Sequence, residues 1–310
     1  MTIRKTYIAS AITAAYASAQ DWESFDVHTN GSLKQFHFKE HSQWIDVENT
    51  GNGMTLAMNS NVFIHDYPYE KQYWAYKPRV RGGSVEYDVE FKDMGCGCVA
   101  GLYAVNLNDE QCSENEKAGT PQCATVDVMQ ANPFGFNTSA HPCSGGNCEG
   151  QSQCFYNMAV EGVEKYGSGA YGPGGSKVNT DKKFHVKVEF LSTVNYQSLW
   201  GMRTTLSQDG NEIVLEADCQ DYIEALNAKI EGSMGFVASA WDNRYTGTAT
   251  NAEFEQCTSC EEDAPTCSDA SFTITDLKWK EYGSNETPPE KEESEDEEEE
   301  DEDDSSWAQY

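Results

Sequence analysis

The segment Cys123-Ala-Thr-Val-Asp-Val-Met-Gln-Ala-Asn132, with His141-Pro-Cys143 after it, is the most informative part of the chain. In an extended strand, alternate side chains point to the same face, so Thr125 and Asp127 lie together. Gln130 joins them only if a β-bulge inserts one residue between it and Asp127. We therefore expect a strand that presents several polar side chains on one face.

Outside this segment, alternation of polar and apolar residues predicts more strands with one buried face. Residues 84–91, 184–190 and 271–277 have this pattern, and the apolar run 234–241 predicts a further strand. Gln208-Asp-Gly-Asn211 predicts a hairpin turn, because Asp-Gly tolerates positive φ. These segments together indicate a fold built from hairpins.

Only one segment has clear helical spacing. Apolar residues recur at that spacing within 221–230, and Gly232 can end the helix. Many short strands, turns rich in Gly, Asn and Pro, and one short helix predict an all-β fold, an antiparallel sandwich or barrel. A parallel α/β fold is disfavoured, since helices do not alternate with the strands.

On these motifs the chain resembles clan B glycoside hydrolases, the family 7 and family 16 enzymes that cut β-1,4- or β-1,3(4)-glucans. The resemblance spans roughly residues 80–282 and implies a concanavalin-like jelly-roll sandwich of two antiparallel sheets. The matching pieces, in the order of those enzymes, are residues 125–132 against Glu-x-Asp-x-x-Glu-Ala-Asn, then His141-Pro-Cys143, Tyr171-Gly-Pro-Gly174, 179–190, 235–242 and 271–279.

The catalytic motif departs from that family at two positions. There the first glutamate is the nucleophile and the last is the general acid/base, whereas this chain has Thr125 and Gln130. Retaining hydrolysis needs two carboxyl groups about 5–5.5 Å apart. A threonine hydroxyl is a poor nucleophile without a base, and a glutamine amide donates no catalytic proton. Asp127 is the retained acid, and the resemblance gives it the role of orienting the nucleophile.

Sugar binding does not depend on the two replaced carboxylates, because aromatic rings and polar side chains supply it. Trp241 is the candidate stacking residue, and Asp127, Asn132 and His141 are candidate polar contacts. Arg203 is a further candidate, although arginines usually lie on the surface. Two of these residues have a structural alternative. Trp241 could lie in the sandwich core, and His141 could lie in a loop beside a disulfide.

Other residues bear on the same site. Tyr245 stands where the family has a second tryptophan, which predicts a shorter or reshaped binding site. Glu149, Glu161 and Glu164 follow the catalytic-type strand, and nothing in the sequence places them on it.

The net charge and the two terminal segments indicate which partners and which compartment to expect. The 310 residues carry a formal net charge of −31, which excludes nucleic acid and anionic membranes as partners, and no apolar run is long enough for membrane insertion. Residues 1–19 are predicted to be a secretory signal, which indicates an extracellular wall or matrix protein. Residues 20–283 form the glucanase-like domain, and 284–310 form an acidic tail predicted to be disordered.

The eleven cysteines are interpreted as disulfide partners of a secreted protein, with one left over. Cys257-Thr-Ser-Cys260 with Cys267 is a zinc alternative, which lacks a nearby histidine to complete it. We expect no cofactor in the domain. The acidic tail is the candidate site for calcium, other divalent cations or a basic partner.

Three functions follow from these observations. The first is a catalytically degenerate glucanase-fold protein that binds β-glucan or a related wall or matrix polysaccharide. The second is an active glycoside hydrolase or transglycosylase that uses a non-standard acid pair. The third is a structural extracellular matrix protein whose working part is the cation-binding acidic tail.

Overall fold

The structure is a computed structural model of the whole chain, and its fold is described over part of the sequence. The described residues are 23–29, 32–40, 47–65, 79–106, 124–141, 154–158, 162–193, 196–217, 223, 226–227, 234–242 and 267–281. The leader 1–19 and the tail 284–310 lie outside them, so both remain predictions from sequence.

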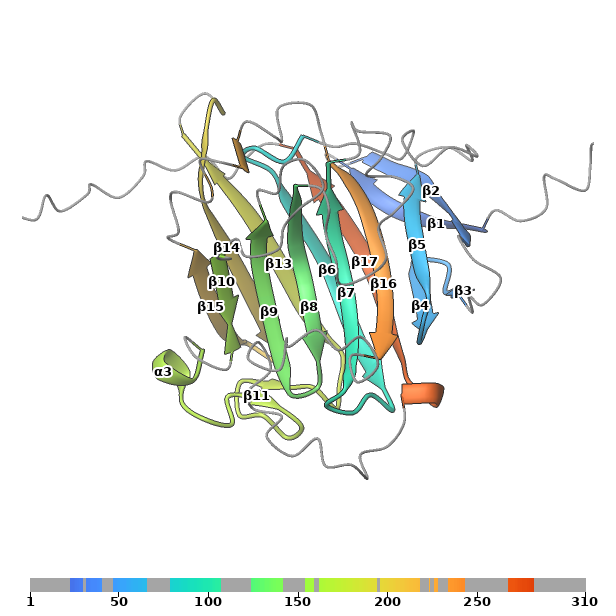
Figure 1. Ribbon diagram of the computed structural model, residues 1–310, viewed down its shortest axis with the longest axis vertical. Helices are drawn as coiled ribbons and strands as arrows, with labels where there is room; N and C mark the ends of the chain where they lie inside the picture. Colours follow the sequence, from blue (N-terminus) through green and yellow to red (C-terminus); the bar gives the residue numbers. More distant parts are fainter. Residues whose placement is uncertain are drawn as a thin grey trace, which may run out of the picture.

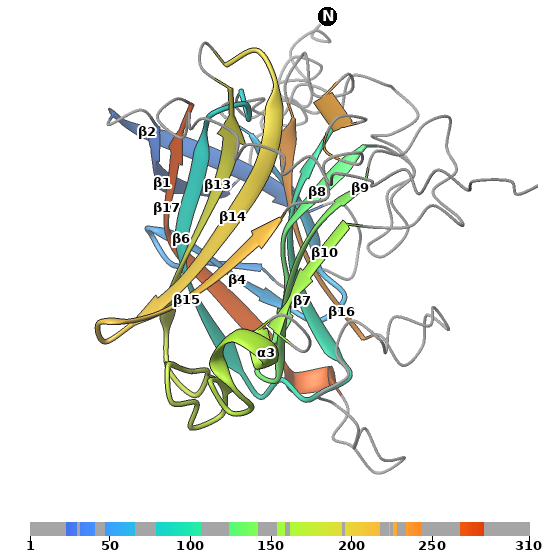
Figure 2. The same cartoon turned by 90° about the vertical axis from the view of Figure 1, so that its left-hand side faces the viewer.

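Most of the described strands form one hydrogen-bonded path that folds back on itself into two layers (Figures 1 and 2). The first layer runs in the order β10 (Cys154–Asn157), β9 (Gly135–His141), β8 (Thr125–Asn132), β7 (Cys98–Val105), β16 (Gly235–Asp242) and β5 (Asn61–His65). The path then passes through β2 (Ser32–Glu40) and β1 (Glu23–Thr29).

The second layer continues from β1 through β17 (Ser271–Lys280), β6 (Ser84–Lys92), β13 (Phe184–Ser192), β14 (Leu199–Gln208) and β15 (Asn211–Ala217). A short branch, β3 (Val47–Asn49) and β4 (Gly53–Ala57), attaches to β17. Pairing along the path is antiparallel except between β1 and β17. The expected all-β sandwich of antiparallel strands is confirmed.

Strands of the second layer alternate because their outer face meets solvent. In β6 and β13 the buried positions alternate with partly exposed ones over most of their length, as predicted from the sequence. Strands β7, β9 and β16 are buried at every position, so both of their faces are covered. The first layer therefore has a second, covered face that points away from the sandwich core.

Side chains from both layers meet in the core. Phe136 of β9 packs edge-on against Tyr171, 6.3 Å between centroids, and Tyr171 packs in the same way against Phe184 of β13 at 5.9 Å. Thr138 of β9 and Thr204 of β14 share a hydrogen bond of 3.0 Å between the layers. The same core holds the large apolar side chains of both sheets.

The predicted hairpin turn is present. Gln208 pairs with Asn211, and the two residues between them, Asp209 and Gly210, have φ of 50° and 80°. Positive φ at both central positions gives the turn a twist that matches the flanking strands.

Helices are few in the described part of the chain. Ile223, Leu226 and Asn227 of the predicted helix are helical, and the first two are buried. The sequence did not predict α3 (Val163–Tyr166). The 3-10 helix η5 (Cys267–Asp269) and the paired strands β11 (Tyr171–Gly172) and β12 (Val178–Asn179) complete the described elements.

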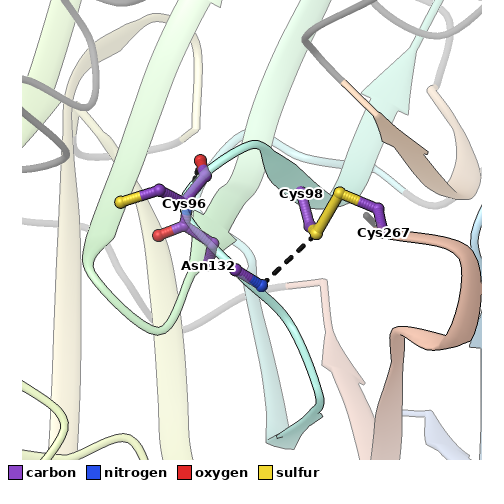
Figure 3. The surroundings of a disulfide bond; sticks show 5 residues. Cys96, Cys98, Asn132 and Cys267 are labelled. Atoms are coloured by element: carbon purple, nitrogen blue, oxygen red, sulfur yellow. Dashed lines mark hydrogen bonds between the residues drawn. A yellow bond between two sulfur atoms is a disulfide. The ribbon is translucent and has the colours of Figure 1, made fainter. Parts of the chain in front are cut away.

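A disulfide joins Cys98, at the start of β7, to Cys267 in η5 (Figure 3). Cys96 is also disulfide-bonded. The bond links the first layer to the segment that leads into β17, and it excludes Cys267 from the zinc set considered above.

Candidate functional site

The site is built on a β-bulge in β8. Opposite β9, Asp127 pairs with Ser139 and Gln130 pairs with Asn137, so two residues of β8 face one of β9. Pairing with β7 shifts at the same place, where Asp127 is opposite Tyr103. One inserted residue restores the alternation after Asp127, and Gln130 therefore shares its face, as the sequence analysis required.

This face points away from the sandwich core, and we call it the outer face of the first layer. Val126, Met129 and Ala131 belong to the main core, so the alternate positions of β8 lie on the outer face. A separate apolar cluster covers the neighbouring strands there, made of Phe63, Val99, Tyr103, Val105, Val237 and Trp241. In Figure 2 the outer face is the side of β7, β8, β9 and β16 turned away from β6, β13 and β14.

Asp127 is held by two neighbours from β9. Ser139 Oγ donates to Asp127 Oδ2 at 2.6 Å, and His141 Nε2 lies 2.7 Å from the same oxygen. Ser139 Oγ and His141 Nε2 are 2.9 Å apart. All three side chains are buried, with exposed fractions of 2%, 1% and 6%. A buried carboxylate with two such partners is fixed in position, which suits an orienting role better than attack on a substrate.

The other two motif positions carry no acid. Thr125 is buried beside Asp127, and Gln130 is partly exposed with its Nε2 3.4 Å from Tyr103 Oη. Strands β7, β8, β9 and β16 contain two carboxylates, Asp127 and Asp242. Asp242 follows Trp241 directly, so it points to the opposite side of β16. These four described strands thus supply no pair of carboxylates on the outer face.

Two aromatic rings lie beside Gln130. Tyr103 of β7 and Trp241 of β16 have ring centroids 6.1 Å apart with an angle of 33° between their planes. The Tyr103 ring lies across Gly101 of its own strand, in the space that a side chain there would fill. Trp241 is thus outside the sandwich core, and the pair can act as a stacking surface once a ligand reaches it.

The remaining candidates are placed elsewhere. Asn132 is buried, and its amide is used in the β8–β9 turn: Oδ1 accepts from the backbone N–H of Phe134 and Gly135, and Nδ2 donates to the Cys96 carbonyl. Figure 3 shows Asn132 beside Cys96. Its contacts indicate a structural role.

Arg203 belongs to β14 in the second layer, where Nε donates to Glu216 at 2.6 Å. Arg203 and Asp127 therefore lie on different layers, which the sequence could not predict because it does not reveal which layer a strand joins. Glu164 is exposed on α3, which lies against β15 through Tyr166 and Val214. Tyr245, Glu149 and Glu161 lie outside the described residues.

Ser139 and Tyr103 were not predicted from the sequence as site residues. Ser139 stands two residues before His141 on a strand, so the period of two could have identified it. Tyr103 lies in β7, where both faces are buried and the sequence is apolar throughout, and no such signal marks it. Among the described residues, no group of three His, Cys, Asp or Glu is arranged to bind a metal ion. The helices in the described ranges are also too short or too polar to cross a bilayer.

Comparisons with known proteins agree with this architecture. No family model matches the chain, and no curated protein matches it in sequence. Among solved structures, the endocellulase EGI of Humicola insolens matches with TM-score 0.60 and 14% identity over 85% of this chain and 97% of its own. A GH7 family cellobiohydrolase from Daphnia pulex matches with TM-score 0.61 and 14% identity over the same shares. An endoglucanase I complexed with cellobiose matches with TM-score 0.61 and 13% identity over 85% and 97%. The chain therefore has the β-sandwich fold of GH7 cellulases, at a sequence identity that establishes the fold alone.

Proposed function

We propose that the protein binds a β-glucan or related polysaccharide on the outer face of the first layer and does not hydrolyse it. The observation that carries this proposal is the polar strand β8, where Asp127 is held by Ser139 and His141 while Thr125 and Gln130 occupy the other two positions. Similar folds were solved with cellobiose and with cellotetraose, which supports a glucan as the ligand class.

Loss of hydrolysis follows from the chemistry at positions 125 and 130. The resemblance places the nucleophile and the proton donor at these two positions. A threonine without a base is a poor nucleophile, and a glutamine amide does not donate a catalytic proton. Losing a positioned proton donor costs about 10²- to 10⁴-fold in rate, and losing the nucleophile removes the covalent route as well. Asp127 is buried, and the described strands β7, β8, β9 and β16 place no second carboxylate on its face, so it cannot replace both.

Restoring the two carboxylates tests the proposal. Purified protein should bind laminarin or cellulose and should release no reducing sugar, whereas Thr125→Glu with Gln130→Glu should gain at least roughly 10²-fold in hydrolysis. Asp127→Asn added to that double variant is the matched control and should lower the gain. Failure of the wild-type protein to bind either glucan would contradict the proposal.

We also propose that residues 1–19 are removed on secretion and that the domain 20–283 works outside the cell. The acidic tail, 284–310, then extends from it as a site for calcium or a basic partner. Intact mass of the secreted protein tests the first point, with a new N-terminus expected after Ala19. Calcium titration of the full chain and of a chain lacking 286–310 tests the second, and equal uptake would exclude the tail.

A further inference from the structure

Uncharged polar residues form a row across the outer face, interrupted by Gly101 on β7. Register places Asn137 of β9 opposite Gln130 of β8, Gln130 opposite Gly101 of β7, and Gly101 opposite Ser239 of β16. Asn61 of β5 continues the row beside Ser239. The row lies next to the line formed by Asp127 and Tyr103, so it belongs to the same face as the site above.

Several polar atoms in this row are buried without a partner. Both Nδ2 and Oδ1 of Asn137 are buried and make no hydrogen bond within the described structure, and the same holds for Ser239 Oγ. Asn137 is 0% exposed and Ser239 is 1% exposed. Buried amides and hydroxyls are nearly always hydrogen-bonded, because leaving one unpaired costs folding free energy. Such atoms at a candidate site indicate the place of a ligand.

The chemistry of the row selects an uncharged ligand. Asn137 offers a donor and an acceptor side by side, and a sugar hydroxyl can accept from the first while it donates to the second. A carboxylate or sulfate only accepts, so it would leave Asn137 Oδ1 unpaired and would lie near Asp127. Strands β5, β7, β8, β9 and β16 contain no lysine or arginine to offset such a charge.

We propose that Asn137 and Ser239, three strands apart in the row that contains Gln130, hydrogen-bond the hydroxyl groups of different hexose units of one neutral glycan chain and make the site selective for neutral over acidic glycans. This rests on the proposed function and names its ligand class. Gln130, the partly exposed member, is where the row meets solvent. Tyr103 and Trp241 supply apolar surface beside the row, as sugar rings require.

Calorimetric titration of the full chain tests the proposal with cellohexaose and laminarihexaose as neutral probes and a β-1,4-linked hexauronate as the acidic one. Asn137→Leu, which removes both polar atoms and keeps the same number and branching of side-chain heavy atoms, should weaken binding of the better neutral probe at least tenfold. Its unfolding midpoint should stay level or rise, because an unpaired buried amide is gone. Ser239→Ala should weaken binding at least threefold, and it serves as the second variant if Asn137→Leu does not fold.

Thr138→Val is the matched control, because Thr138 is buried on the same strand but faces the core and Thr204. Its affinity should stay within twofold of wild type. The inference would be overturned, with glucan binding left intact, if Asn137→Leu bound the neutral probe as tightly as the wild type does. It would also be overturned if the wild type bound the hexauronate as tightly as the neutral probes. Absence of wild-type binding to both neutral probes would overturn both proposals. If the wild type hydrolysed a neutral probe and Asn137→Leu raised the KM tenfold, only the proposal that the protein does not hydrolyse its ligand would be overturned.

Discussion

Replacing Gly101 with alanine should displace the Tyr103 ring and weaken folding and glycan binding together. A Cβ at this position would lie 2.5 Å from Cε2 and 2.6 Å from Cζ of Tyr103. Carbon atoms in contact prefer about 3.5–4.0 Å, so the ring must move by roughly 1 Å. That movement separates Tyr103 from Gln130 Nε2, now at 3.4 Å, and alters its packing on Trp241, now at 6.1 Å.

The magnitude follows from two opposing effects. Forcing extra volume into a packed site costs about 1–3 kcal/mol. Alanine in a strand regains about 0.5–1 kcal/mol over glycine, because the unfolded chain loses conformational freedom. The free energy of unfolding of Gly101→Ala should therefore fall, by up to about 2.5 kcal/mol. Glucan affinity should fall as well, since the stacking surface is disturbed.

A double-mutant cycle with Tyr103→Ala isolates the cause. Urea unfolding, followed by tryptophan fluorescence, gives the free energy of unfolding for the wild type, each single variant and the double variant. With the ring absent, Gly101→Ala should become neutral or slightly stabilising. An equal destabilisation by Gly101→Ala in both backgrounds would refute the contact between the ring and Gly101.

Three further perturbations have defined outcomes. Tyr171→Phe should lower the free energy of unfolding by about 1 kcal/mol, because Tyr171 Oη donates to the Asn132 carbonyl. Tyr87→Phe should leave the free energy of unfolding unchanged or raise it, because the buried Tyr87 hydroxyl has no partner within the described structure. Burial raises the pKa of both tyrosines well above their ordinary 10.0. The free energy of unfolding should therefore fall as the pH rises above 10, because the unfolded chain then releases protons that the folded chain keeps. Unfolding midpoints measured from pH 8 to 11 check this, and a flat profile would contradict it. Replacing Cys98 and Cys267 together with alanine should cost roughly 2–5 kcal/mol in urea unfolding, because the bond closes a loop with a sequence separation of 169.

The strands with one solvent-exposed face were the ones best predicted from the sequence. β6, β13 and β17 alternate because solvent covers their outer side, so the period of two is visible in the letters. β7 and β9 are buried on both faces and carry no such period, and neither was predicted as a strand. Pairing of Cys98 with Cys267 depends on the approach of distant segments, which no local pattern reports.

The candidate site was partly predictable for the same reason. Asp127, His141 and Trp241 were identified through the resemblance, and the bulge that aligns Gln130 is present. The sequence did not show that Arg203 lies on the other layer from Asp127, because layer membership depends on the path of the whole chain rather than on one strand. The unpaired amide of Asn137 depends on what surrounds it in three dimensions, so the sequence alone could not reveal it.

Product analysis of cellohexaose incubated with the wild-type protein distinguishes glycan binding from hydrolysis. Binding without cleavage predicts that the hexasaccharide stays intact at a protein concentration that saturates it. Appearance of shorter cello-oligosaccharides in proportion to protein, and their loss in Asp127→Asn, would contradict the account, because Asp127 would then belong to a working catalytic pair.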